Sequence, residues 1–243
     1  METQTESPSR ETHRFQVEVS QVLHLVIHSL YSHREVFLRE LVSNASDAID
    51  KRKFRAITEP SLSAAEDPVI RIIPNRDART VTIEDDGVGM TRDELVKNLG
   101  TIAHSGSKKF LEALKAQGES RDINLIGQFG VGFYSAWLVA DHVEVVSRAA
   151  GSDEAFRWSS DAKDDFTVEP AERDRVGTSV VLHLKPDQDE FLDAYTLRNL
   201  ITRYSDFVGH TILLKKEEPK ADEDPFETVN QARALWQRPK GEI

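Results

Sequence analysis

The sequence contains no cysteine. This absence excludes a disulfide framework, a zinc site built from thiolates and a cysteine nucleophile. A chain without cysteine fits a reducing compartment, and the cytoplasm is the location we expect.

Long hydrophobic segments are also missing. No apolar run approaches the ~20 residues that span a bilayer. Residues 1–12 lack the basic start and the apolar stretch of a secretion signal. We therefore expect no association with a membrane.

Basic residues are fewer than acidic ones. Lysine and arginine number 31 against 42 aspartate and glutamate residues, so the formal net charge is −11. This balance disfavours binding to the phosphate backbone of nucleic acids, although it leaves room for a local basic patch.

The length and composition of the chain indicate a folded protein. A length of 243 residues allows one or two domains of ~100 to 200 residues each. The content of 39% hydrophobic and 30% charged residues is that of a globular protein with some solvated segments. We find no internal repeat.

The first part of the chain consists of predicted helices followed by predicted strands. Apolar spacing predicts a helix from Val19 to about Leu30 and another over residues 35–56. Two β-type runs, 69–73 and 80–85, are joined by residues that suit a hairpin. This order predicts an α+β fold.

A glycine-rich stretch follows. Thr91 and Glu94 form a capping box that opens a short helix ending near Gly100. From Gly100 to Gly132 glycines alternate with short helical segments, such as 108–117. This composition is typical of a mobile cover over a site.

The second part of the chain is predicted to supply most of an antiparallel sheet. A helix over residues 133–140 precedes the strands, and a helix over residues 189–204 follows them. Residues 215–227 are rich in acids, lysine and proline, so we expect a solvated connector and a folded body that ends near Leu214. The predicted strands are 142–148, 155–159, 166–169, 178–185 and 212–214.

One face of the helix at 35–56 is polar. Helical spacing puts Glu40, Asn44 and Asp47 on one side, opposite an apolar stripe. The residues alone favour an ordinary solvated face. The alternative is chemical, because an amide oxygen can bind Mg²⁺ and a carboxylate one turn away can accept a proton from water.

Asp85 ends a predicted strand on the same face as the apolar Val81 and Ile83. A carboxylate that points toward a core costs several kcal/mol unless groups donate hydrogen bonds to it. Either Asp85 starts the turn that follows, or it binds a ligand that carries an amino group, such as adenine.

Three glycines at 127, 130 and 132 precede the predicted helix at 133–140. They could let backbone N–H groups approach a phosphate, although glycines also serve sharp turns. The pattern matches neither the P-loop nor the dinucleotide fingerprint. Thr178, on a late strand, is more often an ordinary sheet residue than a ligand.

His24 and His28 are four residues apart, as metal ligands on a helix can be. No third ligand is spaced to join them, so we predict no transition-metal site. No G-x-S-x-G motif is found, and Ser29 and Ser32 lack the partners of a catalytic serine.

Four motifs together resemble the amino-terminal ATPase domain of the ninety-kilodalton heat-shock (Hsp90) chaperones, bacterial type. Their order and spacing match as well, and the resemblance runs from about Phe15 to the end of the chain. It implies a Bergerat fold, shared with gyrase, mismatch-repair and histidine-kinase ATPases, in which helices cover one face of a mixed, mostly antiparallel sheet. The motifs are E-L-V-S-N-A-S-D-A (40–48), D-D-G-V-G-M (85–90), N-L-G-T-I-A (98–103) and G-Q-F-G-V-G-F (127–133).

The resemblance also implies a role for each matching residue. Asp85 would bind adenine, Asn44 would bind Mg²⁺ beside the phosphates, and Glu40 would be the general base or orient water for hydrolysis. His104 stands where many relatives have lysine, so a phosphate contact there would be weaker and dependent on pH. The other implied nucleotide-binding residues are Asp47, Gly89, Met90, Asn98, Gly130, Val131, Gly132, Phe133 and Thr178.

The domain organisation follows from the same resemblance. Residues 1–14 would be a disordered tail, 15–214 the ATP-binding domain with a lid at about 91–127, and 215–243 a charged linker and the start of a middle domain. Because that middle domain supplies an arginine and a further domain supplies dimerisation, this chain would bind ATP or ADP with Mg²⁺, hydrolyse ATP weakly and be a monomer.

The whole protein would be a homodimeric, ATP-dependent chaperone that assists the folding of unfolded client proteins in the stress response. It would not bind nucleic acid. The alternatives are a nucleotide-gated interaction module, a DNA-linked ATPase of the same fold, which the charge disfavours, and a histidine kinase, for which no phosphoacceptor segment precedes the motifs.

Overall fold

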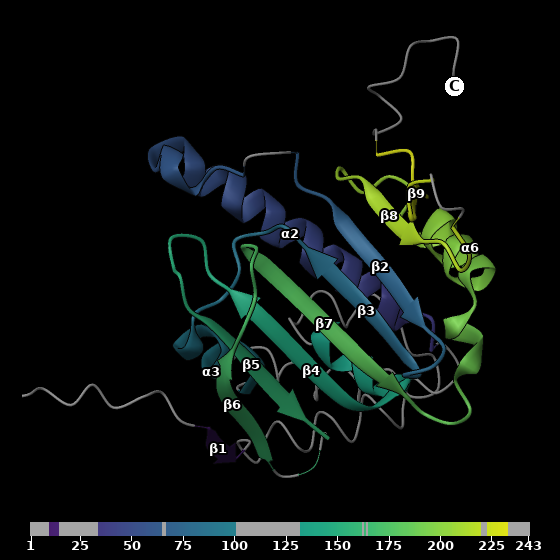
Figure 1. Cartoon of the computed structure of the whole chain (residues 1–243), viewed down its shortest axis with the longest axis horizontal. Coiled ribbons are helices and arrows are strands. Elements are labelled where there is room, and N and C mark those ends of the chain that lie inside the picture. The colour runs from purple at the N-terminus through teal and green to yellow at the C-terminus, as the bar shows by residue number, and fades with distance from the viewer. Residues whose placement is uncertain are drawn as a thin grey trace, which may run out of the picture.

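The computed structural model describes residues 10–14, 34–64, 67–100, 132–161, 163, 165–219 and 223–232. These residues form one nine-stranded sheet in the order β1-β6-β5-β4-β7-β3-β2-β8-β9, and helices cover one of its faces (Figure 1). The strands are β1 (Glu11–Arg14), β2 (Ile70–Asn75), β3 (Thr80–Asp85), β4 (Ala140–Arg148), β5 (Ala155–Ser160), β6 (Asp165–Ala171), β7 (Gly177–Leu184), β8 (Ile212–Lys215) and β9 (Phe226–Thr228).

The sheet is mixed and mostly antiparallel, as predicted. β2 and β8 pair in parallel, whereas the other neighbouring strands pair in antiparallel fashion. In the register of β3 against β7, Asp85 lies opposite Thr178. None of the helices in the described ranges is long and apolar enough to cross a membrane.

The described part of the chain contains three α-helices and three 3-10 segments, and η1 packs against α2 rather than against the sheet. Helix α2 crosses behind β2 and β3 in Figure 1, so its apolar stripe meets the core face of the sheet. The helical elements are α2 (Val36–Thr58), α3 (Arg92–Gly100), α6 (Ala194–Tyr204), η1 (Pro60–Leu62), η2 (Gly132–Leu138) and η3 (Asp189–Leu192).

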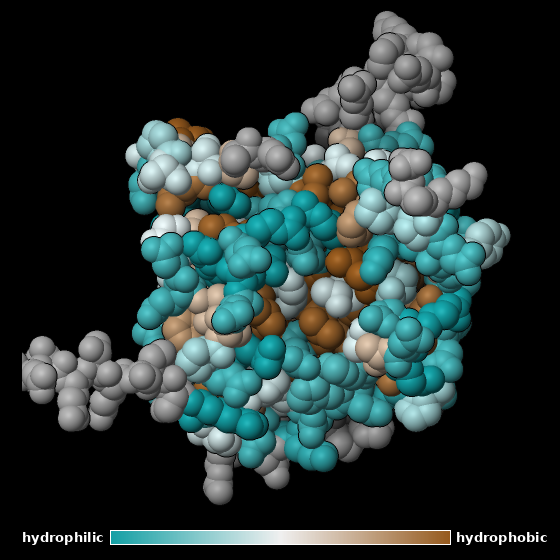
Figure 2. Space-filling model, in the orientation of Figure 1, coloured by the Kyte–Doolittle hydropathy of each residue, from teal (hydrophilic) through white to brown (hydrophobic). Residues whose placement is uncertain are grey.

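The two faces of the sheet differ because side chains alternate along each strand. On β4, for example, Val143 and Val145 are buried, whereas Glu144 between them is partly exposed. The face that carries no helix is turned toward the viewer in Figure 2 and is mostly hydrophilic, with some hydrophobic side chains between the polar ones. We call it the open face.

A group of aromatic rings joins η2 to the sheet and to α3. The rings of Trp137 and Trp158 are 6.1 Å apart and almost fully buried. The hydroxyl of Tyr134 donates a hydrogen bond to the carbonyl oxygen of Leu99 at 3.1 Å. The burial of each large ring stabilises the folded state by on the order of 2 kcal/mol. The rings hold η2 against the sheet, and the hydrogen bond from Tyr134 then fixes the end of α3.

Two helices in the structure differ from their predictions. The helix predicted at 133–140 is the 3-10 segment η2, and Ala140 already belongs to β4. This segment is buried on nearly every side, so it does not have the one-sided apolar stripe of a surface helix. The helix predicted at 189–204 is divided into η3 and α6 at Asp193, whose extended backbone and capping side chain start α6.

Both predicted ends of the folded body are also corrected. Residues 11–14, assigned to a disordered tail, form β1 and pair with β6. The body does not end near Leu214, because β9 returns and pairs with β8. Asn230 then accepts a hydrogen bond from the backbone N–H of Ile212 at 2.8 Å, which satisfies a donor at the start of β8. The predicted first helix, the segment 101–131 and residues 233–243 lie outside the described residues.

Candidate functional site

A cavity of about 330 Å³ lies between α2, α3 and the core face of β3, β4 and β7. This volume is at the lower end of the range of small-molecule sites. Most of its lining is apolar, and Ile83, Val145 and Phe133 contribute to it. The polar side chains that line it are Asn44, Asp47, Lys51, Asp85, Glu94, Asn98 and Thr178.

Asp85 is the buried acid of this cavity. It lies on the core face with Val81 and Ile83, as the alternation predicted, and is 6% exposed. Its Oδ1 accepts a hydrogen bond from the backbone N–H of Gly87 at 2.8 Å. Asp85 therefore starts the turn and also faces the cavity, so the two alternatives drawn from the sequence are compatible.

Burial raises the pKa of Asp85 from 3.8 to about 7. Desolvation is the main cause. The backbone N–H groups of Gly87 and Thr178 and the charge of Arg173 favour the carboxylate and oppose the increase. A ligand that donates a hydrogen bond to this carboxylate would further offset the cost of its burial.

The turn after β3 needs glycine for steric reasons. A Cβ atom on Gly87 would lie 2.6 Å from the Cβ of Ala48 on α2. Gly89 has a φ of 65°, and a Cβ there would lie 1.9 Å from the carbonyl oxygen of Arg148. Between them, the backbone N–H of Val88 donates to the carbonyl oxygen of Ala48 at 3.0 Å. The glycines thus let the turn pack between α2 and β4, where it completes the cavity wall.

Ser147 connects three parts of this wall. Its hydroxyl accepts from the backbone N–H of Met90 at 2.8 Å, lies 2.9 Å from Oγ1 of Thr178 and donates to the carbonyl oxygen of Gly177 at 3.2 Å. A hydroxyl has one hydrogen to donate and two lone pairs. When Ser147 donates to Gly177, Thr178 must donate to Ser147 to keep the third contact.

That arrangement uses the only hydroxyl hydrogen of Thr178 and leaves its oxygen as an acceptor. Asp85 and Thr178 then present two acceptors side by side at one end of an apolar cavity. The chemistry of this pair fits a flat ring that carries N–H donors. Ser147 was not predicted, since a buried serine on a strand gives no local signal.

Helix α2 provides the polar rim of the cavity. Asn44 and Asp47 are exposed and line it. Lys51 lines it as well, one turn beyond Asp47, and was not predicted, although continuing the same helical spacing would have found it. An amide oxygen and a carboxylate at this rim form a donor set that suits a hard cation such as Mg²⁺.

Glu40 is placed differently from its polar neighbours on α2. It is buried, and its Oε1 accepts hydrogen bonds from Nε and Nη2 of Arg39 at 3.0 and 2.6 Å. A Cβ on Gly132 would lie 2.6 Å from Oε2 of Glu40, so the start of η2 covers this side chain. In the part of the chain that the structure describes, Glu40 does not line the cavity, whereas Asn44 and Asp47 on the same side of α2 are exposed.

The remaining predicted site residues divide into two groups. Gly89, Met90, Asn98 and Phe133 line the cavity, and Gly132 packs against Glu40. His104, Gly130 and Val131 lie outside the described residues, as does most of the predicted lid at about 91–127. The capping box at the start of α3 is confirmed, because Thr91 and Glu94 exchange hydrogen bonds.

The fold and the cavity identify the class of protein. The family described as "Histidine kinase-, DNA gyrase B-, and HSP90-like ATPase" matches residues 31–182. The chain belongs to this family of ATPases. The Bergerat-type fold implied by the four motifs is thereby confirmed.

Within the family, the chain is similar to bacterial Hsp90 chaperones. It is 63% identical over 245 residues to the chaperone protein HtpG of Myxococcus xanthus, covering 98% of this chain and 38% of that protein. The HtpG proteins of Bordetella avium and Gluconobacter oxydans are 53% and 52% identical, covering 98% and 100% of this chain and 39% and 38% of those proteins. The chain thus spans about two fifths of these relatives, and the resemblance read from its motifs is confirmed.

Proposed function

We propose that this chain is the nucleotide-binding domain of an ATP-dependent chaperone, and that the cavity binds the adenine of ATP or ADP. The observation that carries the proposal is the pair of Asp85 and Thr178 at the apolar end of the cavity. The exocyclic amino group of adenine supplies the N–H donors that two acceptors require. Ile83, Val145 and Phe133 supply apolar surface for the ring.

The phosphates would lie toward the polar rim on α2. The amide oxygen of Asn44 would hold Mg²⁺, and the ion when bound would neutralise phosphate charge. Asp47 would contribute to the same rim, and the predicted loop Gly130 to Gly132 would bind the phosphates through its backbone. Asn98 and Phe133 would contact the ribose and phosphates, and His104 would make the weaker phosphate contact.

Glu40 would orient or deprotonate the attacking water. It lies one helical turn from Asn44, on the same side of α2 as the proposed ion site. Phosphoryl transfer needs mainly positioning and charge stabilisation, which a fixed carboxylate and a bound ion can provide. The contact with Arg39 holds the carboxylate in one orientation.

The activity of the whole protein requires parts beyond this chain. We propose that it is a homodimer that acts on unfolded client proteins in the stress response, since the HtpG relatives named above are chaperones. The isolated chain would be a monomer that binds nucleotide and hydrolyses it weakly. The cytoplasmic location and the absence of nucleic-acid binding stay predictions from the sequence.

Calorimetry with ADP and GDP tests the adenine site. We expect ADP with Mg²⁺ to bind this chain, and GDP to bind at least ~100-fold more weakly, because guanine presents an acceptor oxygen where adenine has its amino group. Asp85→Asn should abolish ADP binding. Asp93→Asn, which changes an exposed acid outside the cavity, is the matched control. Equal affinity for the two nucleotides would reject the proposed recognition.

A second candidate is a nucleotide-gated interaction module in which hydrolysis is incidental. The buried, ion-paired position of Glu40 outside the described cavity wall favours it. In the full-length protein, Glu40→Ala should keep ADP affinity and lose both ATP turnover and chaperone activity if the chain is an enzyme. Chaperone activity that persists without ATP turnover would support the nucleotide-gated interaction module.

A further inference from the structure

Two histidines face each other across neighbouring strands of the open face. His142 on β4 lies directly opposite His183 on β7, and Glu144 follows two residues along β4 on the same face. The alternating neighbours Val143 and Leu182 are fully buried in the core. The three polar side chains therefore point away from the core and away from the Asp85 cavity.

The ligand atoms of these three side chains are close together. One atom from each lies within 4.8 Å of the other two. Oε1 of Glu144 is 2.8 Å from Nε2 of His183 and 3.9 Å from Nε2 of His142. In a tetrahedral zinc site with bonds of about 2.0 to 2.1 Å, ligand atoms are about 3.3 Å apart. The two separations from Oε1 of Glu144, 2.8 and 3.9 Å, lie on either side of this value. Small side-chain rotations would therefore bring the three ligand atoms to the distances of a zinc site.

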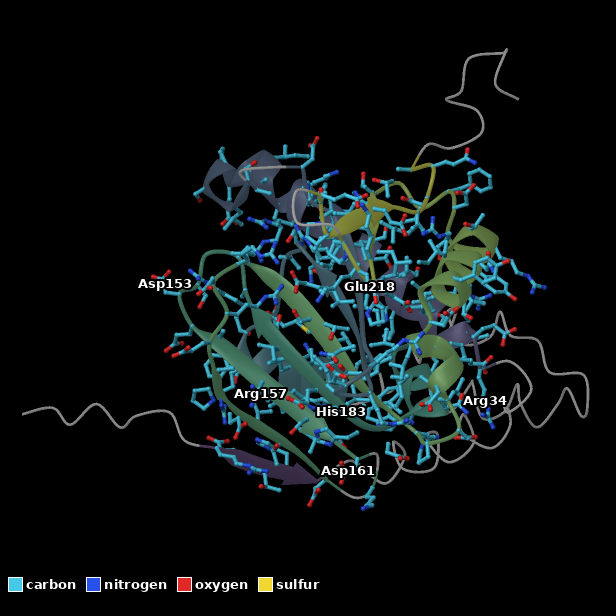
Figure 3. The ribbon with its side chains drawn as sticks, turned by 45° about the vertical axis from the view of Figure 1, so that its right-hand side comes forward. Arg34, Asp153, Arg157, Asp161, His183 and Glu218 are labelled. Carbon is cyan, nitrogen blue, oxygen red and sulfur yellow. The ribbon has the colours of Figure 1, made fainter. Side chains whose placement is uncertain are left out.

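The neighbouring groups orient these ligands. Oδ1 of Asp161 lies 2.5 Å from Nδ1 of His142, which makes Nδ1 the donor and turns Nε2 toward Glu144. A carboxylate behind a histidine is the usual partner of a metal-binding imidazole. Nε of Arg157 is 3.1 Å from Oε2 of Glu144 and leaves Oε1 to the histidines. Figure 3 shows Arg157, His183 and Asp161 near one another on the sheet.

The charge of Arg157 would oppose a metal ion if nothing compensated it. Its Nη1 also lies 3.4 Å from Oε1 of Glu169, so the guanidinium is shared between two carboxylates. Lys163 lies 3.8 Å from Asp161 and Arg10 lies 3.8 Å from Glu169, so the acids around the two histidines are matched by basic side chains. The surrounding charges balance, and the attraction for a cation comes from the three ligand atoms themselves.

We propose that His142, Glu144 and His183 bind a divalent transition-metal ion, with Zn²⁺ as the first candidate. Two imidazole nitrogens and one carboxylate oxygen form a known zinc ligand set, with the fourth position open to water. Mg²⁺ and Ca²⁺ prefer oxygen ligands alone, so they should not compete. Cu²⁺ and Ni²⁺ suit the same ligands and would bind as well.

The sequence predicts no transition-metal site, because His24 and His28 stand at the spacing of helical ligands and no third ligand is spaced to join them. This cluster depends instead on the pairing of β4 with β7, two strands that are far apart in the chain. An ion bound there would join the strands across the sheet. It would stabilise the folded state, because the unfolded chain does not hold the three ligands together.

Titration with ZnCl₂ tests the site in chain freed of metal with a chelator, without nucleotide. We expect calorimetry to show one Zn²⁺ per chain and a rise in Tm. His142→Ala and His183→Ala should each weaken binding by ~100-fold and abolish the rise in Tm. Asp161→Ala, which removes only the partner of Nδ1, should weaken it by ~10- to 100-fold.

His13→Ala is the matched control. His13 also lies beside a carboxylate, with Nε2 3.4 Å from Glu11, but it is on β1 and outside the cluster. Its removal should leave Zn²⁺ affinity unchanged. Zn²⁺ binding that persists at wild-type affinity when both His142 and His183 are replaced, or no binding at micromolar Zn²⁺, would overturn the proposal. Unchanged ADP affinity in the two variants would separate this site from the nucleotide cavity.

A measurement on the wild-type chain avoids any effect of the variants on folding. Substoichiometric Cu²⁺ should broaden the backbone NMR signals of residues 142–144 and 182–184 before those of other residues. Early broadening elsewhere, for example around His24 and His28, would assign the metal to another place and reject the cluster.

Discussion

Ionising Asp85 in the folded protein is costly, because its carboxyl group is buried at the end of the cavity. The increase in its pKa from 3.8 to about 7 means that the folded state keeps a proton which the unfolded chain releases. The contribution of Asp85 to the free energy of unfolding should therefore be most favourable below pH 4 and should decrease as the pH rises toward 7. For a shift of 7 − 3.8, or about three units, the loss is on the order of 4 kcal/mol.

Asp85→Asn should remove this dependence. We expect the free energy of unfolding of the variant, relative to wild type, to rise between pH 4 and 7 and to level off above pH 7. Urea denaturation across this range measures the difference, with Asp93→Asn as the control that follows wild type. Parallel curves for wild type and Asp85→Asn would mean that the carboxyl group titrates normally.

Ser147→Ala should destabilise the cavity wall. The change leaves the backbone N–H of Met90 without its partner and removes the acceptor of the Thr178 hydroxyl. An unsatisfied buried donor costs about 1 to 3 kcal/mol, and we expect a loss of that size in urea denaturation together with weaker ADP binding. Ser159 forms a comparable pair with Thr167 on the open face, so Ser159→Ala should cost less than half as much and leave ADP affinity unchanged.

Among the elements, α6 depends on the side chain of Asp193. Its Oδ2 accepts hydrogen bonds from the backbone N–H and the hydroxyl of Thr196 at 2.8 and 3.0 Å. Asp193→Ala removes this cap and should lower the free energy of unfolding by about 1 kcal/mol. Glu190→Ala, which changes an exposed acid on η3, should change it by less than ~0.5 kcal/mol. A chemical denaturation series compares the two, and equal effects would exclude the capping role.

Regular alternation and helical spacing predicted most elements to within a few residues. β3 was predicted with its observed ends, and α2 with small differences at each end. The division between η3 and α6 was missed because Asp193 and Thr196, a capping pair, lie inside an apolar stripe that continues on both sides. β1 and β9 were missed because short edge strands with polar residues have no hydrophobic pattern of their own.

The same reasoning explains which parts of the site were found. Asp85 stood out because a charge broke an apolar alternation, and Asn44 because a helical face carried two acids and an amide. Ser147 gave no such contrast, whereas Lys51 was missed because the helical spacing was not continued beyond Asp47. The burial of Glu40 depends on η2 packing over α2, and no spacing within α2 predicts that contact.

For the molecule as a whole, the segment after Leu214 should be needed for stability. A chain that ends after Leu214 loses β9 and the two hydrogen bonds that Asn230 makes to Ile212 and His210. We expect it to unfold at a clearly lower urea concentration than a chain that ends after Ala232, which keeps every described contact. Identical midpoints of urea denaturation for the two chains would mean that the folded body ends near Leu214, as the sequence predicts.

Both outer edges of the sheet are formed by the two ends of the described chain, β1 at one edge and β9 at the other. During synthesis on the ribosome, β1 emerges first, yet its partner β6 is translated much later. Until β6 has been made, β1 has no partner strand, and this edge of the sheet stays incomplete. Such long-range pairing slows folding and exposes strand backbone to other chains, so this domain should itself be vulnerable to aggregation until its last strands have been made.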